Sequence, residues 1–213
     1  CQRGDEYIVG ANAHTFRYEG GGAAVLGSIQ PHSLAMDQDG CLSLDDIRSA
    51  IKPDDIHFAC TKVVCLENTH AGTPLPADYP LKVRHLCDEF GLALHLDGAR
   101  LFNAAAAQQV SPAHIAEHFD SVSICLSKGL GAPVGSLLVG SRDLIKLARR
   151  WRKVLGGGMR QGGIIAAGGL HALTHHLNDL IEDHRRAERI SEVLLGKFGS
   201  GAVRNATNMI HLN

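Results

Sequence analysis

Short apolar runs alternate with helical segments along most of this chain, and this order restricts the fold more than any other feature. Strands that are separated by whole helices are joined by right-handed crossovers, which predicts a mainly parallel sheet with helices packed on it. The sequence therefore predicts an α/β fold. The expected strands are 7–9, 62–66, 92–97, 122–128, 136–139 and 208–212, and the expected helices are 18–26, 44–51, 79–90, 112–118, 141–151 and 162–177.

Two of the expected strands end in side chains of opposite charge. The run 92–97 ends in Asp97, and the run 122–128 ends in Lys128. In parallel α/β sheets, reactive groups gather just outside the carboxyl ends of the strands. A lysine and an aspartate delivered there together suit pyridoxal 5′-phosphate, because the amine forms a Schiff base with the cofactor's aldehyde and the carboxylate pairs with its pyridinium nitrogen.

Both residues also have a structural interpretation. An aspartate after a strand is commonly a turn or helix-cap residue, and a lysine in that position is usually solvated. The residues around Lys128 favour a functional role. A glycine-rich turn that begins at Gly129, followed by a second strand-like run, places this lysine at a tight and sheltered bend.

The composition excludes several classes of function. A net charge of −1 over 213 residues predicts no attraction to nucleic acid or to an anionic membrane. Six scattered cysteines form no C-x-x-C pair, which predicts small buried thiols in a reducing compartment. No apolar run reaches the roughly 18 residues of a membrane span. We therefore expect a soluble intracellular protein, in the cytosol rather than the mitochondrion.

Four histidines, at positions 171, 175, 176 and 184, crowd one helical region of the sequence. Acidic and amide side chains lie among them, so the pattern favours a solvated helix face over a metal site. The sequence thus predicts no metal.

Five segments of the chain together closely resemble the low-specificity L-threonine aldolases, which are fold-type I enzymes dependent on pyridoxal phosphate. Two of them surround the pair of charged residues: 95–103 (HLDGARLFN) and 124–135 (ICLSKGLGAPVG). The other three are 20–26 (GGGAAVL), 66–70 (LENTH) and 151–160 (WRKVLGGGMR). The resemblance extends from Gly4 to Met209 and implies the large domain of the aspartate-aminotransferase-like fold.

The resemblance implies a role for four residues near the cofactor. Lys128 would form the Schiff base, and Asp97 would hold the pyridine nitrogen protonated. His14 matches the histidine that stacks on the cofactor ring. Arg100 matches a residue close to the cofactor and to the substrate carboxylate, although it could instead pair structurally with Asp97.

Three further residues match positions farther along the family pattern. His57 matches a second histidine proposed to assist the chemistry, or it is a strand histidine whose hydrogen bonds are satisfied. Lys153 and Arg160 match basic residues that approach the cofactor phosphate across a dimer interface, or they belong to a solvated basic face. The implied partners are a small amino-acid substrate and further copies of the chain, in a homodimer or homotetramer.

The implied reaction is retro-aldol cleavage of L-threonine or L-allo-threonine to glycine and acetaldehyde. It requires a general base within hydrogen-bond reach of the substrate hydroxyl. His14, His57 and a bound water are the candidates. Two other functions remain open: a β-eliminating lyase that uses the same lysine and aspartate, and a non-catalytic fragment that folds or dimerises without cofactor.

We expect the chain to have two parts. Residues 1–155 form the cofactor-binding large domain, incomplete at its N-terminus. Residues 156–213 form a hinge, a helical segment and the start of the small C-terminal domain. The family's phosphate-binding turn lies upstream and most of its small domain lies downstream, so we expect an internal fragment that lacks both ends and has little or no activity alone.

Overall fold

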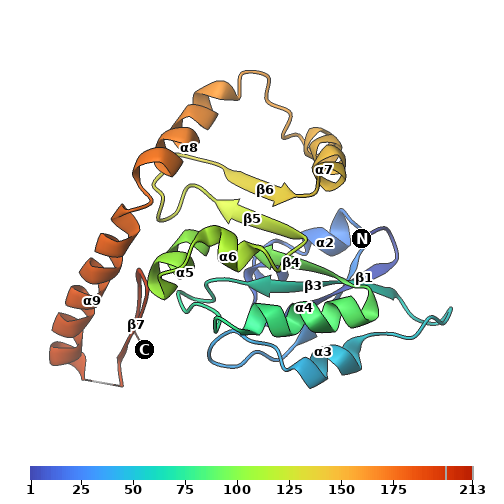
Figure 1. Cartoon of the computed structure of the whole chain (residues 1–213), viewed down its shortest axis with the longest axis horizontal. Coiled ribbons are helices and arrows are strands. Elements are labelled where there is room, and N and C mark those ends of the chain that lie inside the picture. The colour runs from blue at the N-terminus through green and yellow to red at the C-terminus, as the bar shows by residue number, and fades with distance from the viewer. Residues whose placement is uncertain (200, 213) are drawn as a thin grey trace.

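Six strands form one sheet in the order β2-β1-β3-β4-β5-β6 in the computed structural model, which describes residues 1–199 and 201–212 (Figure 1). The first five strands are parallel and β6 is antiparallel to β5. A separate antiparallel hairpin, β7–β8, follows the last helix. The predicted mainly parallel α/β fold is confirmed. Ser200 and Asn213, both in the predicted second part of the chain, lie outside the described residues.

The strands are β1 (Asp5–Gly10), β2 (Gln30–Leu34), β3 (Cys60–Glu67), β4 (Ala93–Asp97), β5 (Ser121–Cys125), β6 (Ser136–Gly140), β7 (Val203–Ala206) and β8 (Met209–Leu212). The helices are α1 (His14–Arg17), α2 (Gly22–Val25), α3 (Leu44–Ala50), α4 (Tyr79–Phe90), α5 (Leu101–Gln108), α6 (Pro112–Ala116), α7 (Arg142–Val154), α8 (Gly163–His175) and α9 (Asp179–Phe198). None of these helices, within the part of the chain described, is long and apolar enough to cross a membrane.

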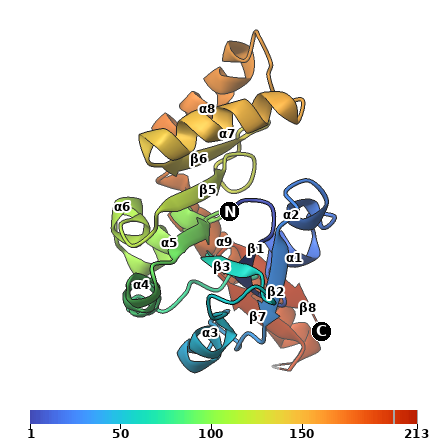
Figure 2. The same ribbon diagram turned by 90° about the vertical axis from the view of Figure 1, so that its right-hand side faces the viewer.

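The two faces of the sheet are covered by different helices (Figure 2). Along each strand successive side chains point to opposite faces, so alternate residues enter different cores. Ile8, Val64 and Leu94 belong to the main core, which the buried faces of α3, α4, α5 and α6 complete. Val9 and Cys65 point the other way and belong to a smaller cluster near α1.

Local signals account for several helix boundaries. The Ser43 hydroxyl accepts a hydrogen bond from the Asp46 amide and so caps the start of α3. Gly91 ends α4 in the left-handed region, at φ 65°, where a residue without Cβ is favoured. Ser141 caps α7 in the same way as Ser43 caps α3. These helices lie close to the expected ranges.

The expected helix 18–26 is confirmed only at its centre, where α2 covers Gly22–Val25, and is wrong for the rest of its range. Gly20 and Gly21 have φ values of 59° and 68°, and these left-handed residues separate two single turns, α1 and α2. The sequence also did not predict α1, β2, α5, α9 and β7. Strand β2 contains Pro31 and polar side chains, and it is tolerated because it lies at the edge of the sheet.

A buried carboxylate ties the amino ends of three strands together. Glu6 on β1 is fully buried. Its carboxylate accepts hydrogen bonds from Lys52 at 3.3 Å, from Thr61 on β3 at 3.1 Å and from Gln30 on β2 at 3.0 Å. Because a buried charge is costly unless it is paired, Lys52 is required for this arrangement.

We predict that Lys52→Met lowers the free energy of unfolding by about 3 kcal/mol, because it leaves the Glu6 charge buried without its cationic partner. Urea denaturation measures the loss. Arg48→Met is the matched control, because it breaks the Arg48–Glu89 pair, which lies at the surface. The control should lose far less stability, and equal losses in the two variants would contradict a special role for the Glu6 cluster.

Candidate functional site

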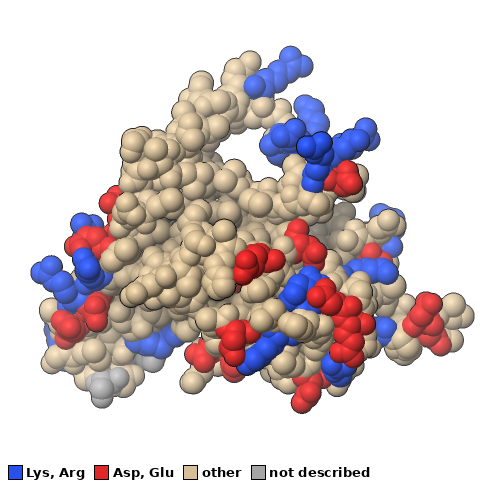
Figure 3. Space-filling view, in the orientation of Figure 1, with Lys and Arg blue, Asp and Glu red and all other residues tan. Residues whose placement is uncertain are grey.

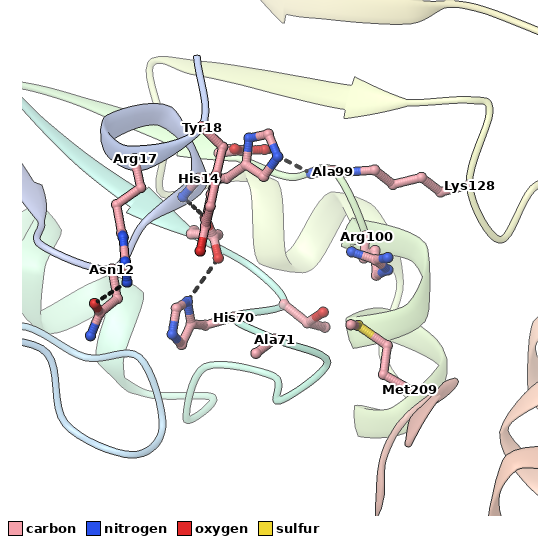
Figure 4. Close-up of a pocket in the computed structure, with 13 residues that line it drawn as sticks. Asn12, His14, Arg17, Tyr18, His70, Ala71, Ala99, Arg100, Lys128 and Met209 are labelled. Carbon is pink, nitrogen blue, oxygen red and sulfur yellow. Dashed lines mark hydrogen bonds and ion pairs between the residues drawn. The ribbon is translucent and has the colours of Figure 1, made fainter. Parts of the chain in front are cut away.

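A cavity of about 500 Å³ opens at the carboxyl ends of β1, β3 and β4. Thirteen residues line it, and most of them follow directly on these strands (Figure 4). Parallel strands place their carboxyl ends at one edge of the sheet, which is where α/β proteins bind ligands. The cavity brings together Asp97, Lys128, His14 and Arg100, four of the residues predicted from the sequence.

Asp97 is the last residue of β4 and is 8% exposed. Its Oδ1 accepts a hydrogen bond from the Ala99 amide at 3.1 Å. Burial raises the pKa of this carboxyl, and the negative charge of Glu67 raises it further. The charges of Lys128 and His14 act in the opposite direction. The ionised form of Asp97 is therefore disfavoured until a cation lies beside it.

Gly98 explains why a glycine follows Asp97. Its amide donates a hydrogen bond to the Ser123 carbonyl at 2.8 Å, so the backbone passes close to β5. A Cβ at this position would lie 2.9 Å from the same carbonyl oxygen. Any side chain here would push the end of β4 away from β5 and move Asp97 with it.

Lys128 lies in the loop that connects β5 and β6. The Gly131 amide donates to the Lys128 carbonyl at 2.9 Å and closes a turn there. A Cβ on Gly129 would lie 2.9 Å from Leu180 of α9, so the loop packs tightly against that helix. In Figure 4 Lys128 reaches the cavity from this loop, and His14 reaches it from α1 on the opposite side.

Two buried polar atoms of the cavity wall have no hydrogen-bond partner among the described residues. They are Nε of Arg100 and Oγ1 of Thr69. A buried polar atom normally has a hydrogen-bond partner, so these two atoms mark a part of the wall where a bound polar group or a water is expected.

Three predicted site residues do not line the cavity. The side chain of His57 is 78% exposed, and its Nδ1 lies 2.7 Å from the carboxylate of Asp55. Lys153 lies in the last turn of α7, and Arg160 lies in the loop between α7 and α8. The roles of these three residues stay predictions.

Helix α7 carries most of a basic surface. Its six cations gather on one side of the molecule (Figure 3). They are Arg142, Lys146, Arg149, Arg150, Arg152 and Lys153. None of the residues of α7 is buried, so this surface is open in the single chain.

Glu67 and His70 are among the residues of the cavity wall that the sequence did not identify as site residues. Glu67 ends β3, and its carboxylate lies 2.8 Å from Nδ1 of His70 and 2.6 Å from the backbone nitrogen of His14. Both lie in the segment 66–70, which is only one of the five segments that resemble the threonine aldolases and has no predicted role in the site. The sequence signal that could have identified Glu67 is its position as an acidic residue at the end of a strand next to the strand that ends in Asp97.

Within the described residues no cluster of three or more metal-binding side chains is found.

Comparison with known proteins identifies close relatives over the whole chain. The sequence pattern of the family described as beta-eliminating lyase matches residues 1–212. The low specificity L-threonine aldolase of Escherichia coli K12 is 54% identical over 210 residues, which cover 99% of this chain and 63% of that protein. The Saccharomyces cerevisiae low specificity L-threonine aldolase is 40% identical over 207 residues, covering 94% of this chain and 53% of that protein.

Solved structures agree with this result. Threonine aldolase from Leishmania major superimposes with a TM-score of 0.78 at 26% identity, over 95% of this chain and 59% of that chain. A PLP-dependent aminotransferase from Streptococcus suis, at 16% identity, has a TM-score of 0.67 over 97% of this chain and 54% of that chain, and so shares the fold. The predicted fold-type I architecture is confirmed. The chain spans about 63% of the length of its Escherichia coli relative.

We predict that Asp97→Asn stabilises the ligand-free chain above about pH 4. A carboxyl whose pKa is raised on folding binds its proton more tightly in the folded state, so stability falls as the pH rises from the unfolded pKa through the folded pKa. The asparagine variant lacks this loss and can still accept from the Ala99 amide. Thermal unfolding at pH 4 and pH 8 measures the difference, which should grow with pH; a constant difference would contradict the prediction.

Proposed function

The chain belongs to the beta-eliminating lyase family, and we propose that it catalyses the pyridoxal 5′-phosphate-dependent cleavage of L-threonine or L-allo-threonine to glycine and acetaldehyde. The relatives named threonine aldolases support this choice of reaction. The activity is a proposal because the chain spans less than two thirds of those relatives.

One observation carries the proposal: an amine, a buried carboxylate and an unpaired guanidinium nitrogen line one cavity. These groups belong to Lys128, Asp97 and Arg100. Asp97 and Arg100 lie at the end of β4 and in the connection to α5, whereas Lys128 comes from the loop between β5 and β6, so the meeting of the amine with the other two groups is a property of the fold. Each group is of the type that an amino-acid substrate or pyridoxal phosphate requires.

The residues of the cavity fit the cofactor. Asp97 is buried and its pKa is raised by burial, which suits a carboxylate that awaits a ring cation. Lys128 supplies an amine through which the cofactor would be held. Bound there, pyridoxal phosphate would act as a sink for the electron pair left at the substrate α-carbon when the Cα–Cβ bond breaks.

The protein side chains would then have distinct tasks. Asp97 would keep the proton on the pyridine nitrogen, since a neighbouring cation stabilises its own ionised form. Arg100 would bind the substrate carboxylate with the guanidinium edge that has no partner among the described residues. His14 would cover the cofactor ring from the α1 side.

The general base at the substrate hydroxyl remains a choice between His14, His57 and a bound water. His14 lines the cavity, whereas His57 is exposed and already bonded to Asp55. A carboxylate-bound imidazole outside the cavity can reach the substrate only if another part of the assembly brings it there. Within a single chain, His14 or a water is therefore the better-supported candidate.

We further propose that Lys153 and Arg160 bind the cofactor phosphate of a second copy in a homodimer or homotetramer. Neither residue lines the cavity of its own chain. Apolar side chains next to them are exposed: Trp151 by 59%, Val154 by 72% and Leu155 by 56%. Such a patch on one helix suits a protein–protein contact.

The division of the chain into a large domain up to residue 155 and a second part from residue 156 stays a prediction, as does a location in the cytosol.

We predict that Lys128 is the lysine that binds the cofactor aldehyde. Borohydride reduction of the chain with pyridoxal phosphate, followed by peptide mapping, should label Lys128, because this lysine and the buried Asp97 line the same cavity. Lys146→Ala, on the surface of α7, is the matched control and should leave the labelling unchanged. Preferential label on any other lysine would contradict the assignment.

The products distinguish the candidate functions. Because the chain alone is expected to have little activity, it is used in stoichiometric amount with excess pyridoxal phosphate. The small amount of threonine that it cleaves should yield glycine and acetaldehyde in equal amounts, and Lys128→Ala should yield neither. Asp97→Asn should bind the cofactor yet turn over at least about 100-fold more slowly, because an amide cannot hold the ring proton. Ammonia and a keto acid would instead indicate β-elimination. Absence of both products and of any cofactor absorbance change would indicate a non-catalytic fragment.

A further inference from the structure

Glu67 is an acidic residue of the cavity wall to which the proposed function gives no task. Its side chain is 11% exposed, and both carboxylate oxygens are engaged. Oε2 accepts a hydrogen bond from the backbone amide of His14 at 2.6 Å, and Oε1 lies 2.8 Å from Nδ1 of His70. One carboxylate thus joins the end of β3 to the start of α1 and to the loop that follows β3.

Helix α1 depends on this contact because it cannot hold itself in place. It has only four residues, and a single helical turn is unstable alone. Its N-cap residue is Ala13, which has no side-chain acceptor for the first amides of the helix. Glu67, from a different element, supplies that acceptor to His14.

Few other contacts restrain His14. Its ring is half exposed and lies 3.0 Å from the Glu19 carboxylate, which is 58% exposed. The next residue, Thr15, touches Cys65 of β3 only through a weak oxygen–sulfur contact of 3.8 Å. Among the described residues, the bond to Glu67 is therefore the shortest hydrogen bond between α1 and the sheet, and Phe16 adds an apolar contact with the cluster of Val9 and Cys65.

His70 in turn fixes the orientation of Glu67. Its amide and carbonyl exchange hydrogen bonds with Thr73 at 2.9 and 2.8 Å, which closes the loop. The β7–β8 hairpin holds this loop from outside, because Thr207 donates to the Gly72 carbonyl at 2.8 Å and Nε2 of His211 lies 2.8 Å from the Ala71 carbonyl. A Cβ on Gly72 would collide with the Ala206 carbonyl, so hairpin and loop are in close contact.

We propose that Glu67 is a positioning residue of the cofactor site: oriented by His70, it holds His14 at the cavity edge where the imidazole covers the cofactor ring. This inference rests on the proposed function. It also explains why the residue is an acid. When Nδ1 of His70 carries its proton, both partners of Glu67 are donors, and a carboxylate accepts from both whereas an amide accepts from one.

The first test uses the chain without cofactor. In Glu67→Leu, the backbone amide of His14 should exchange its hydrogen about 10- to 100-fold faster, which corresponds to the loss of a hydrogen bond to a charged acceptor. Its NMR resonance should also move. Glu67→Gln keeps one acceptor and should show a smaller change. Thr15→Val, which removes only the weak contact to Cys65, is the control and should exchange within about twofold of the parent.

The second test measures pyridoxal phosphate binding by absorbance and fluorescence. Glu67→Leu should bind the cofactor about tenfold more weakly, whereas Thr15→Val should bind it normally. Unchanged exchange at His14 in both Glu67 variants would overturn the inference, as would normal cofactor affinity despite a released His14 amide. If the leucine variant does not fold, the glutamine variant decides by the same criteria.

The two proposals fail in different ways. A parent chain that binds no pyridoxal phosphate contradicts the proposed function, and with it a role of Glu67 in that site. If the parent chain binds the cofactor but hydrogen exchange at His14 is unchanged in the Glu67 variants, only the proposed role of Glu67 is contradicted. The His14 amide reports on this coupling without any cofactor, so the two outcomes are distinguished.

Discussion

The pairing register between β3 and β4 is the constraint on which the site depends. It places Glu67 directly beside Asp97 at the ends of two neighbouring parallel strands. The Asn68 amide continues this alignment by donating to the Asp97 carbonyl at 2.9 Å. Because a shift by one residue would turn every side chain to the opposite face, the register decides that both acids enter the same cavity.

The carboxylates of Glu67 and Asp97 repel each other, and the surrounding residues stabilise the charge of Glu67 more than that of Asp97. Glu67 is surrounded by donors, the His14 amide and the His70 ring, so its charge is satisfied within the chain. Asp97 receives one backbone hydrogen bond and a raised pKa, caused by burial and by the Glu67 charge. A ligand that brings a positive charge to Asp97 relieves this strain, so the arrangement favours binding of a protonated ring nitrogen.

The cavity wall also depends on segments that are distant in the sequence. Lys128 is placed by a loop packed on α9, and Met209 of β8 reaches the same cavity from the hairpin. Contacts from Thr207 and His211 connect that hairpin to the loop that carries His70. The site is therefore assembled by both ends of the described chain, with His14 near the amino end and Met209 near the carboxyl end.

The sequence by itself determined the mainly parallel sheet and the position of Asp97 at the end of a strand, because hydrophobic periodicity and the alternation of strands with helices can be read along the chain. The expected strand 122–128 ends early, at Cys125, so Lys128 lies in the loop that follows β5 and not at the end of the strand. The sequence did not determine that Gly20 and Gly21 break a helix, since their backbone angles depend on the surrounding fold. Nor did it reveal Glu67 as the contact for His14, because the two are 53 residues apart and meet only through strand pairing. Only the tertiary structure decided which predicted residues share the cavity and that His57 does not, because proximity between loops follows from the packing of whole elements.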